Sequence, residues 1–192
     1  MPRSTPSAAK ILDTALELAE SCGWERLYLH DVATALNCDL AAIARHYRQK
    51  DDLVEAWLDR ADAALFERAR DADLAALAPD KRLEELLMAW LGGIAAHRAL
   101  TGQMLLYKLE LGHVHLQVGA LLRVSRTVQW WREAARRHNL HLARVAEESL
   151  LSAVFLRTFV HWLRHPEVAD ADLRALLRRQ LRGGPLAWLL RA

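Results

Sequence analysis

Apolar residues recur at intervals of three and four along most of this 192-residue chain, a spacing that places them on one face of a helix. The chain has 33 Ala and 37 Leu but only 10 Val, 3 Ile and 6 Thr. Ala and Leu lose less conformational entropy in a helix than β-branched residues do. The sequence therefore predicts an all-α protein, folded as one ordinary domain or as two small ones that share a core.

The first predicted helix spans residues 8–22 and has clear boundaries. Its apolar face is opposed by Lys10 and several acidic residues. Thr5 or Ser7 can accept hydrogen bonds from the free N–H groups of the first turn. Gly23 is suited to the left-handed conformation that commonly ends a helix.

Two short helices are predicted next, at 30–36 and 40–45, and the residues between them favour a turn. Asn37 tolerates a positive φ, and Asp39 can cap the second helix. Lys50 opens a longer helix that reaches about residue 70. Two short helices around a turn of three to four residues are typical of a helix-turn-helix.

The rest of the chain predicts longer helices at 79–97, 115–137 and 142–165. A less regular stretch passes through Gly102 and Gly112, and residues 136–141 indicate a polar loop. The helix at 142–165 is apolar on more than one face, so we expect it to be covered on two sides. Asp170 is expected to cap a last amphipathic helix, which the Gly-Gly-Pro at 183–185 would end.

Several functional classes lack their sequence signals. No uncharged stretch reaches the roughly 18 to 20 residues that a membrane span needs, and the N-terminus lacks the apolar segment of a signal peptide, so we expect a cytoplasmic protein. Cys22 and Cys38 indicate reduced, buried thiols. His161 and His165 lack the further ligands of a zinc site. With no nucleophile motif or phosphate-binding loop either, we expect no enzyme, no metal site and no cofactor.

The N-terminal residues carry a family resemblance. They are the segment 11–18 (ILDTALEL), Gly23-Trp24, Asp31-Val32-Ala33, Arg45-His46-Tyr47 and the segment 50–53 (KDDL). In order and spacing, over about residues 8–55, they resemble the head of the TetR family of transcriptional regulators. The resemblance implies a three-helix helix-turn-helix DNA-binding head at 1–50 on an antiparallel helical ligand-binding and dimerisation body at 51–192. It also implies a homodimer that represses transcription at a palindromic operator until a small ligand splays the two heads.

The positions expected to contact DNA lie in the turn, on the third helix and at its exit. They are Asn37, Leu40, Ala41, Arg45, His46, Tyr47, Arg48 and Lys50. The basic residues among them would neutralise phosphates, assisted by Arg3 or Lys10, and apolar side chains of the third helix can touch thymine methyl groups.

Two departures from the family pattern lie in this head. Tyr28 stands where the family typically has a capping Ser or Thr and cannot cap in the same way. The recognition positions, which are usually polar or aromatic, are apolar, and the residues in question are Leu40, Ala41, Ala42 and Ala44. That face of the third helix has therefore lost most of its hydrogen-bonding groups.

Charge is unevenly distributed along the chain. Residues 1–60 carry 7 basic and 10 acidic side chains, a net charge of −3, whereas residues 61–192 carry 19 and 14, a net charge of +5. DNA affinity comes largely from Lys and Arg that neutralise phosphates. A second hypothesis is therefore open, in which a TetR-fold protein has lost DNA reading and binds a lipid or other apolar ligand, a membrane surface or a protein partner.

The predicted body offers candidates for a pocket that would take a small apolar ligand. They are Trp90, Met104, Tyr107, Trp130, Phe155 and Phe159, and sequence alone does not separate a cavity from a filled core. The helices at roughly 142–165 and 170–182 are expected to form a four-helix dimer interface. The basic segment from Arg174 onward suits either solvated arginines on this dimerisation helix, which we favour, or a membrane surface.

Overall fold

The computed structural model describes residues 5–109 and 114–191, and in these residues all regular structure is helical. This confirms the predicted all-α class. Packing divides the chain into two compact units. One contains the chain up to Arg60 together with His97–Gln117, and the other contains Ala61–Ala96 together with the chain from Val118 onward. The predicted functional boundary at residue 50 is a separate matter and stays a prediction.

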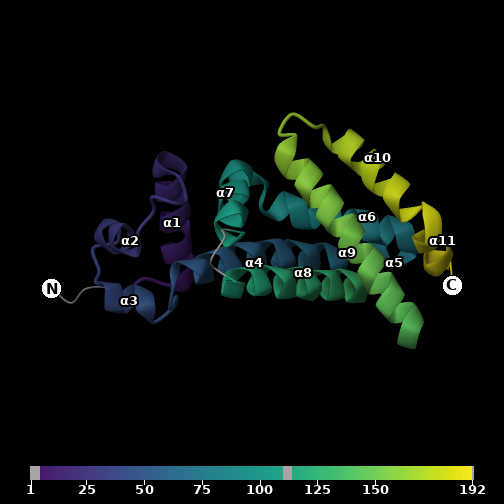
Figure 1. The fold of residues 1–192 in the computed structure, drawn as a ribbon, viewed down its shortest axis with the longest axis horizontal. Helices are drawn as coiled ribbons and strands as arrows, with labels where there is room; N and C mark the ends of the chain where they lie inside the picture. Colours follow the sequence, from purple (N-terminus) through teal and green to yellow (C-terminus); the bar gives the residue numbers. More distant parts are fainter. Residues whose placement is uncertain (1–4, 110–113, 192) are drawn as a thin grey trace. The chain divides into compact units, whose positions relative to one another are not determined.

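Three short helices form the head of the first unit. They are α1 (Ala8–Cys22), α2 (Leu29–Ala35) and α3 (Leu40–Ala44), and α2 packs against both of the others (Figure 1). Ser7 caps α1 by accepting a hydrogen bond from the N–H of Lys10 at 3.2 Å. Gly23 ends the helix with a φ of 85°, a conformation that glycine adopts without a steric penalty. Both predicted boundaries of this helix are confirmed.

The turn between α2 and α3 follows the chemistry of its residues. Asn37 has a φ of 49°, and a carboxylate oxygen of Asp39 accepts a hydrogen bond from the N–H of Ala42 at 2.8 Å. Tyr28 precedes α2 without a side-chain capping bond, as its chemistry predicts. The Asp39 cap therefore stabilises the start of α3, whereas α2 has no such cap and is stabilised by its packing.

The first unit also includes the beginning of α4 (Lys50–Ala69), which the sequence predicts, and a helix that it does not predict, α7 (Arg98–Lys108). A 3₁₀ turn, η1 (Ala95–His97), leads into α7. The predicted helix at 79–97 instead ends as α6 (Pro79–Gly93), and the stretch through Gly102 is helical. A glycine within a helix costs about 1 kcal/mol, which the buried face of α7 offsets. Gly112 lies outside the described residues.

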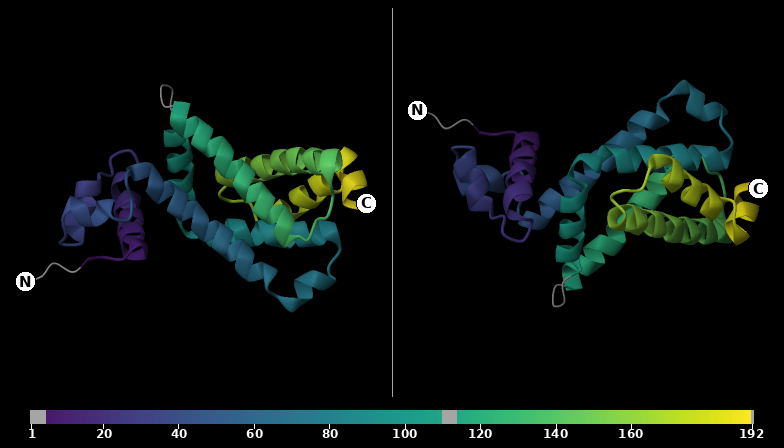
Figure 2. Two further views of the ribbon diagram at one scale, coloured as in Figure 1. Left: turned by 90° about the horizontal axis from the view of Figure 1, so that it is seen from below. Right: turned by 90° about the horizontal axis from the view of Figure 1, so that it is seen from above.

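The second unit is built from the end of α4 and six further helices. These are α5 (Ala72–Ala76), α6, α8 (Val114–Ala134), α9 (His141–Arg164), α10 (Asp170–Leu181) and α11 (Gly184–Arg191), with the first residues of α8 belonging to the first unit. Both α10 and α11 pack against α6 and α9, and Figure 2 shows α9 and α10 alongside one another. The core between these helices contains aromatic and leucine side chains.

The structure adds to or differs from the predictions for this unit at three points. Asp170 is the first residue of α10 rather than its cap, a position held by Ala169 without a side-chain bond. The Gly-Gly-Pro at 183–185 ends α10 but then begins α11, because proline is well tolerated in the first turn of a helix. The short helix α5 was also not predicted. No described helix combines the length and the apolar character that crossing a bilayer would require.

Candidate nucleic-acid interface

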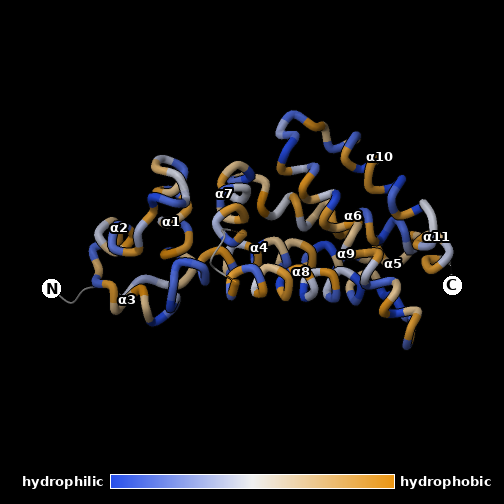
Figure 3. Tube along the Cα trace, in the orientation of Figure 1, coloured by the Kyte–Doolittle hydropathy of each residue, from blue (hydrophilic) through white to orange (hydrophobic). Residues whose placement is uncertain are grey.

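The outer face of α3 presents carbon to solvent. Leu40 is 52% exposed, and Ala41 and Ala44 are exposed as well. Ala42 and Ile43 point inward and are buried in the head. Figure 3 shows this apolar helix followed by a strongly hydrophilic segment. The structure thus places Leu40 and Ala41 on an accessible surface.

Exposed basic side chains follow α3 directly. Arg45 and Arg48 are exposed, and Lys10, in the first turn of α1, is exposed as well. Within residues 5–109 and 114–191, none of these three side chains makes a hydrogen bond or an ion pair. By contrast, Arg26 donates from Nε to the carbonyl oxygen of Cys22 at 2.7 Å. Asn37 and His46 are also exposed, and Arg3 lies outside the described residues.

Lys50 is placed differently from these cations. Its ammonium donates hydrogen bonds to the carbonyl oxygens of Trp24 at 2.5 Å and Glu25 at 3.1 Å. It also lies over the rings of Trp24 and Tyr107, 5.1 Å and 5.2 Å from their centroids. Burial lowers the pKa of this ammonium below its ordinary value.

Tyr47 closes the head rather than facing solvent. The residue is 7% exposed, and its hydroxyl donates to the carbonyl oxygen of Ala8 at 2.9 Å. Burial raises the pKa of this phenol above its ordinary value. The contact brings the start of α1 beside the exit from α3, so Lys10 and Arg48 belong to the same region of the head.

Three acidic residues in the first 60 positions have structural partners. Asp39 caps α3, and Asp52 accepts hydrogen bonds from the N–H groups of Arg48 and Gln49 at 2.7 Å and 3.3 Å. Asp13 pairs with Arg60 at 2.5 Å. These carboxylates therefore have structural roles within the first unit.

A buried lysine from outside the head neutralises two further carboxylates. The ammonium of Lys108 lies 2.8 Å from Asp51 Oδ1 and 2.8 Å from Glu55 Oε1, and Lys108 is 1% exposed. Sequence reasoning missed this residue, although a signal existed. Lys108 stands four positions after Met104, on the face of α7 where apolar residues recur.

The beginning of α7 is also tied to the head. The N–H of Trp24 donates to Oε1 of Gln103 at 2.8 Å, and His97 Nδ1 lies 2.7 Å from Glu20 Oε1. Trp57 donates from its indole nitrogen to Thr101 Oγ1 at 2.8 Å. These contacts join α1, α4 and α7, and no local pattern predicts them because each spans more than 40 positions.

Comparison with solved structures shows a relative that covers nearly the whole chain. A TetR transcriptional regulator from Nitrosomonas europaea ATCC 19718 is 40% identical, covers 94% of this chain and 98% of its own, and superposes with a TM-score of 0.81. The chain belongs to the TetR family of transcriptional regulators.

A second solved structure, a bacterial regulatory protein in the tetR family from Rhodococcus RHA1, is 20% identical. It covers 96% of this chain and 95% of its own with a TM-score of 0.47, so it adds nothing to the family assignment. No family model matches the chain, and no curated protein matches it either. The TetR membership and the all-α TetR fold are as the sequence resemblance predicts.

Three of the six residues proposed for the TetR ligand pocket lie together in the second unit. Trp90 packs edge-on against Phe155 and Phe159, with ring centroids 5.1 Å and 5.2 Å apart, and all three side chains are buried. Met104 and Tyr107 belong to the first unit, on α7. Trp130 is 47% exposed and packs against Phe66 with centroids 5.3 Å apart.

A buried polar network accompanies the aromatic cluster. Asp62 Oδ1 accepts from the indole nitrogen of Trp90 at 2.8 Å and from Thr127 Oγ1 at 3.3 Å, while Oδ2 accepts from Arg123 at 2.8 Å. Both members of the Asp62–Arg123 ion pair are less than 10% exposed. Sequence reasoning did not identify this pair, since its members are 61 positions apart on different helices.

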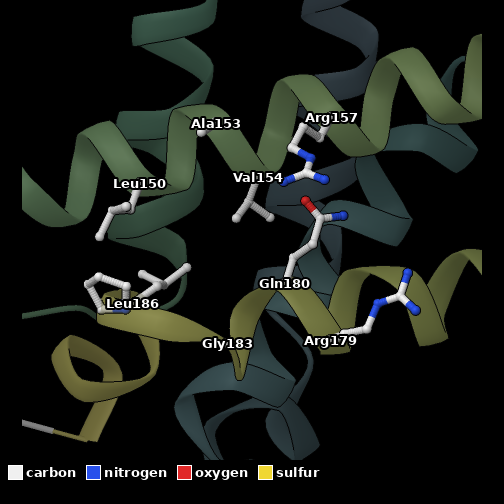
Figure 4. A pocket seen from close by; sticks show the side chains of 9 residues that line it. Leu150, Ala153, Val154, Arg157, Arg179, Gln180, Gly183 and Leu186 are labelled. Carbon is white, nitrogen blue, oxygen red and sulfur yellow. The ribbon is translucent and has the colours of Figure 1, made fainter.

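The surface predicted to carry the TetR dimer is partly apolar and partly grooved. On the outer face of α9, Leu156 and Val160 are 42% and 40% exposed, so only one face of this helix is covered within the chain. A groove of about 370 Å³ lies between α9 and the chain from α10 to α11. Arg157 and Gln180 extend into it from facing helices (Figure 4).

Most arginines on α10 and at its C-terminal end pair with acidic residues of α6. Arg174 Nη1 lies 2.6 Å from a carboxylate oxygen of Glu85, and Arg182 Nε lies 2.6 Å from one of Asp80. Arg178 approaches Glu84 at 3.6 Å. These arginines face α6 and are thereby less available to a membrane surface. Among the described residues, no group of three His, Cys, Asp or Glu is arranged to hold a metal ion.

Proposed function

We propose that this TetR-family protein is a DNA-binding transcriptional regulator, a cytoplasmic repressor that binds a palindromic operator as a homodimer and is released by a small ligand. The observation that supports this most directly is the accessible face of α3 beside three exposed cations, Arg45, Arg48 and Lys10. The proposal is one of a regulator and not of an enzyme. The functional division into a head at 1–50 and a body at 51–192 is part of it.

The arrangement of the head suits a DNA duplex. In helix-turn-helix proteins the second helix of the motif, here α3, enters the major groove, while side chains around it contact the phosphates and fix its position. Arg45 and Arg48 follow α3 within four residues, and the Tyr47–Ala8 hydrogen bond keeps the start of α1 near them. Phosphate contact requires cations that are exposed and not already paired, and these cations meet both conditions within the part of the chain that the structure describes.

The proposed dimer uses α9 and α10. A two-fold interface places the same surface of each subunit against the other, so the surface must be self-complementary. Leu156 and Val160 would leave water on such a contact, and the groove beside Arg157 would receive side chains of the second copy.

The proposed ligand control involves the buried aromatic cluster of Trp90, Phe155 and Phe159. Ligand sites are typically apolar and aromatic with a few placed polar groups, and the Asp62–Arg123 pair provides such groups beside the cluster. A small, mainly apolar ligand suits this chemistry.

The test measures DNA binding by the full-length protein. Fluorescence anisotropy with duplexes from the DNA flanking its own gene, over a range of salt concentrations, should identify a palindromic site. Arg45→Ala and Arg48→Ala should each weaken binding and reduce the salt slope by about 0.9 for each phosphate that is no longer neutralised. Arg70→Ala is the matched control, because Arg70 is an exposed arginine outside the head, paired with Glu67.

Two outcomes would overturn the proposal. One is the absence of DNA binding at low salt, which would support the second hypothesis of a TetR-fold protein that binds a lipid, a membrane surface or a protein partner. The other is a salt slope that all three arginine variants change equally, since this would mean that the head cations have no special position.

A further inference from the structure

We infer that α3 reads its operator through the 5-methyl groups of thymine, which Leu40, Ala41 and Ala44 contact in the major groove. This inference rests on the proposed DNA-binding function and goes beyond it by naming the chemical feature of the bases that is read.

The side chains of α3 offer no other means of reading bases. Its three exposed side chains, Leu40, Ala41 and Ala44, contain only carbon, and the remaining two residues are buried in the head. Asp39, which precedes the helix, uses a carboxylate oxygen to cap it at Ala42. The accessible surface of the helix itself therefore has no side-chain donor or acceptor.

Base edges in the major groove respond differently to such a surface. Guanine, cytosine and adenine present only donors and acceptors, whereas thymine presents a methyl group beside its carbonyl oxygen. A donor or acceptor that faces carbon loses its water without a replacement, which is unfavourable. A methyl group that faces carbon gains from losing its water. The helix therefore favours thymine at the positions it covers and disfavours the other three bases.

The flanking cations point to DNA as the occupant of this apolar face. Arg45 and Arg48 are exposed at the exit of α3, without side-chain partners among the described residues. An apolar surface meant for a protein or a lipid tail would not require two exposed arginines at its edge. Phosphates on either side of the groove supply the opposite charge, so methyl reading by α3 and phosphate contact by the arginines occur together.

The experiment uses the operator selected by the full-length protein from a randomised duplex library. Each thymine of that operator is replaced in turn by deoxyuridine, which removes only the methyl group. Burying one methyl group contributes enough to change affinity about fourfold. We expect a loss of this size at one or two thymines in each half-site and no loss at thymines outside the footprint of α3.

Two protein variants assign the effect to α3. Leu40→Ala should weaken binding to the thymine operator but leave binding to the corresponding deoxyuridine operator nearly unchanged, so that the difference between the two duplexes disappears at one position. Leu40 is half-exposed and alanine favours helices, so we expect this variant to fold, as circular dichroism would verify. Arg45→Ala is the control, because it should weaken binding to both duplexes by the same factor.

The possible failures are distinguishable. Enrichment of a palindrome whose deoxyuridine versions all bind equally well would overturn methyl reading while leaving the proposed function intact. The same conclusion follows if no deoxyuridine effect changes in Leu40→Ala. Failure to enrich or bind any duplex at low salt would instead overturn the proposed function itself.

Discussion

The ammonium of Lys108 lies 2.8 Å from Oδ1 of Asp51, an ion pair that joins the last residue of α7 to the first turn of α4. Lys108 also pairs with Glu55 at 2.8 Å. With its own side chain only 1% exposed, the lysine is held where an apolar residue would ordinarily pack. The helix α7 is thereby fastened to the segment that leads directly out of the head.

Removing this lysine should destabilise the first unit. Lys108→Ala leaves two carboxylates close together without their cation, and we expect the free energy of unfolding to fall by about 2 kcal/mol. This is less than for a fully buried pair, because Asp51 and Glu55 are 13% and 30% exposed. Urea unfolding followed by circular dichroism measures the change. Arg70→Ala, which removes an exposed pair, should change stability by less than about 0.5 kcal/mol, and an equal effect of both variants would contradict the prediction.

Lys50 should support the head without contacting phosphate. Lys50→Met keeps a side chain of similar length beside Trp24 and Tyr107. It removes the N–H donors to the carbonyl oxygens of Trp24 and Glu25. We expect stability to fall by about 1 kcal/mol, while the salt slope of DNA binding stays at the wild-type value. Anisotropy titrations at several salt concentrations test this. A slope reduced as in Arg45→Ala, with unchanged stability, would show that Lys50 contacts the backbone instead.

The burial of Tyr47 predicts that the free energy of unfolding depends on pH in the alkaline range. Burial raises the pKa of its phenol above the ordinary value of 10.0, so the folded state favours the neutral form. The resulting contribution to stability is fully present below pH 10 and is lost as the pH rises through the folded-state pKa. Tyr47→Phe lacks this titration and also the hydrogen bond to Ala8, which contributes about 1 kcal/mol.

The measurement compares wild type and Tyr47→Phe by urea unfolding at neutral pH and at intervals between about pH 9 and pH 11. The advantage of the wild type should be largest at neutral pH and should shrink above pH 10. A difference that stays constant over the alkaline range would mean that the phenol titrates alike in both states.

Glu147 should contribute strongly to the stability of the second unit. It is fully buried, accepts hydrogen bonds from Arg137 Nε at 2.7 Å and from Asn139 Nδ2 at 2.5 Å, and Arg137 also donates to the carbonyl oxygen of Leu189 at 2.7 Å. Glu147→Gln preserves the shape but leaves Arg137 without its counter-charge. We expect a loss of about 3 kcal/mol. Glu133→Gln, at a residue 65% exposed, is the matched control with an expected effect near zero, and similar losses in the two variants would contradict the assignment.

The head could be predicted closely because its signals are local. The cap at Ser7, the stop at Gly23, the positive φ at Asn37 and the cap at Asp39 each depend on side chains within about three residues of the backbone groups they serve. The family resemblance lies in the same segment, so the fold of the head and its family follow from one short stretch of sequence.

The structure departs from the predictions where long-range contacts determine whether a segment is helical or a side chain is paired. The helix α7 has a glycine at position 102 and weak periodicity, yet it is stabilised by partners far away, such as Trp24 for Gln103. In the same way, Arg45 and Lys50 look equivalent in the sequence, but only Lys50 meets the carbonyl oxygens of another segment. The six pocket candidates separate between the two units for the same reason.

By itself, the sequence determined the all-α class, the helix-turn-helix and the TetR family, because helical periodicity, capping and turn chemistry act over a few residues. Only the tertiary structure decided which charges are available. It paired Asp51 and Glu55 with Lys108 and left Arg45 and Arg48 exposed beside α3. Whether a charge is neutralised depends on groups that approach it within a few ångströms in space, and these groups come from positions that no local pattern connects.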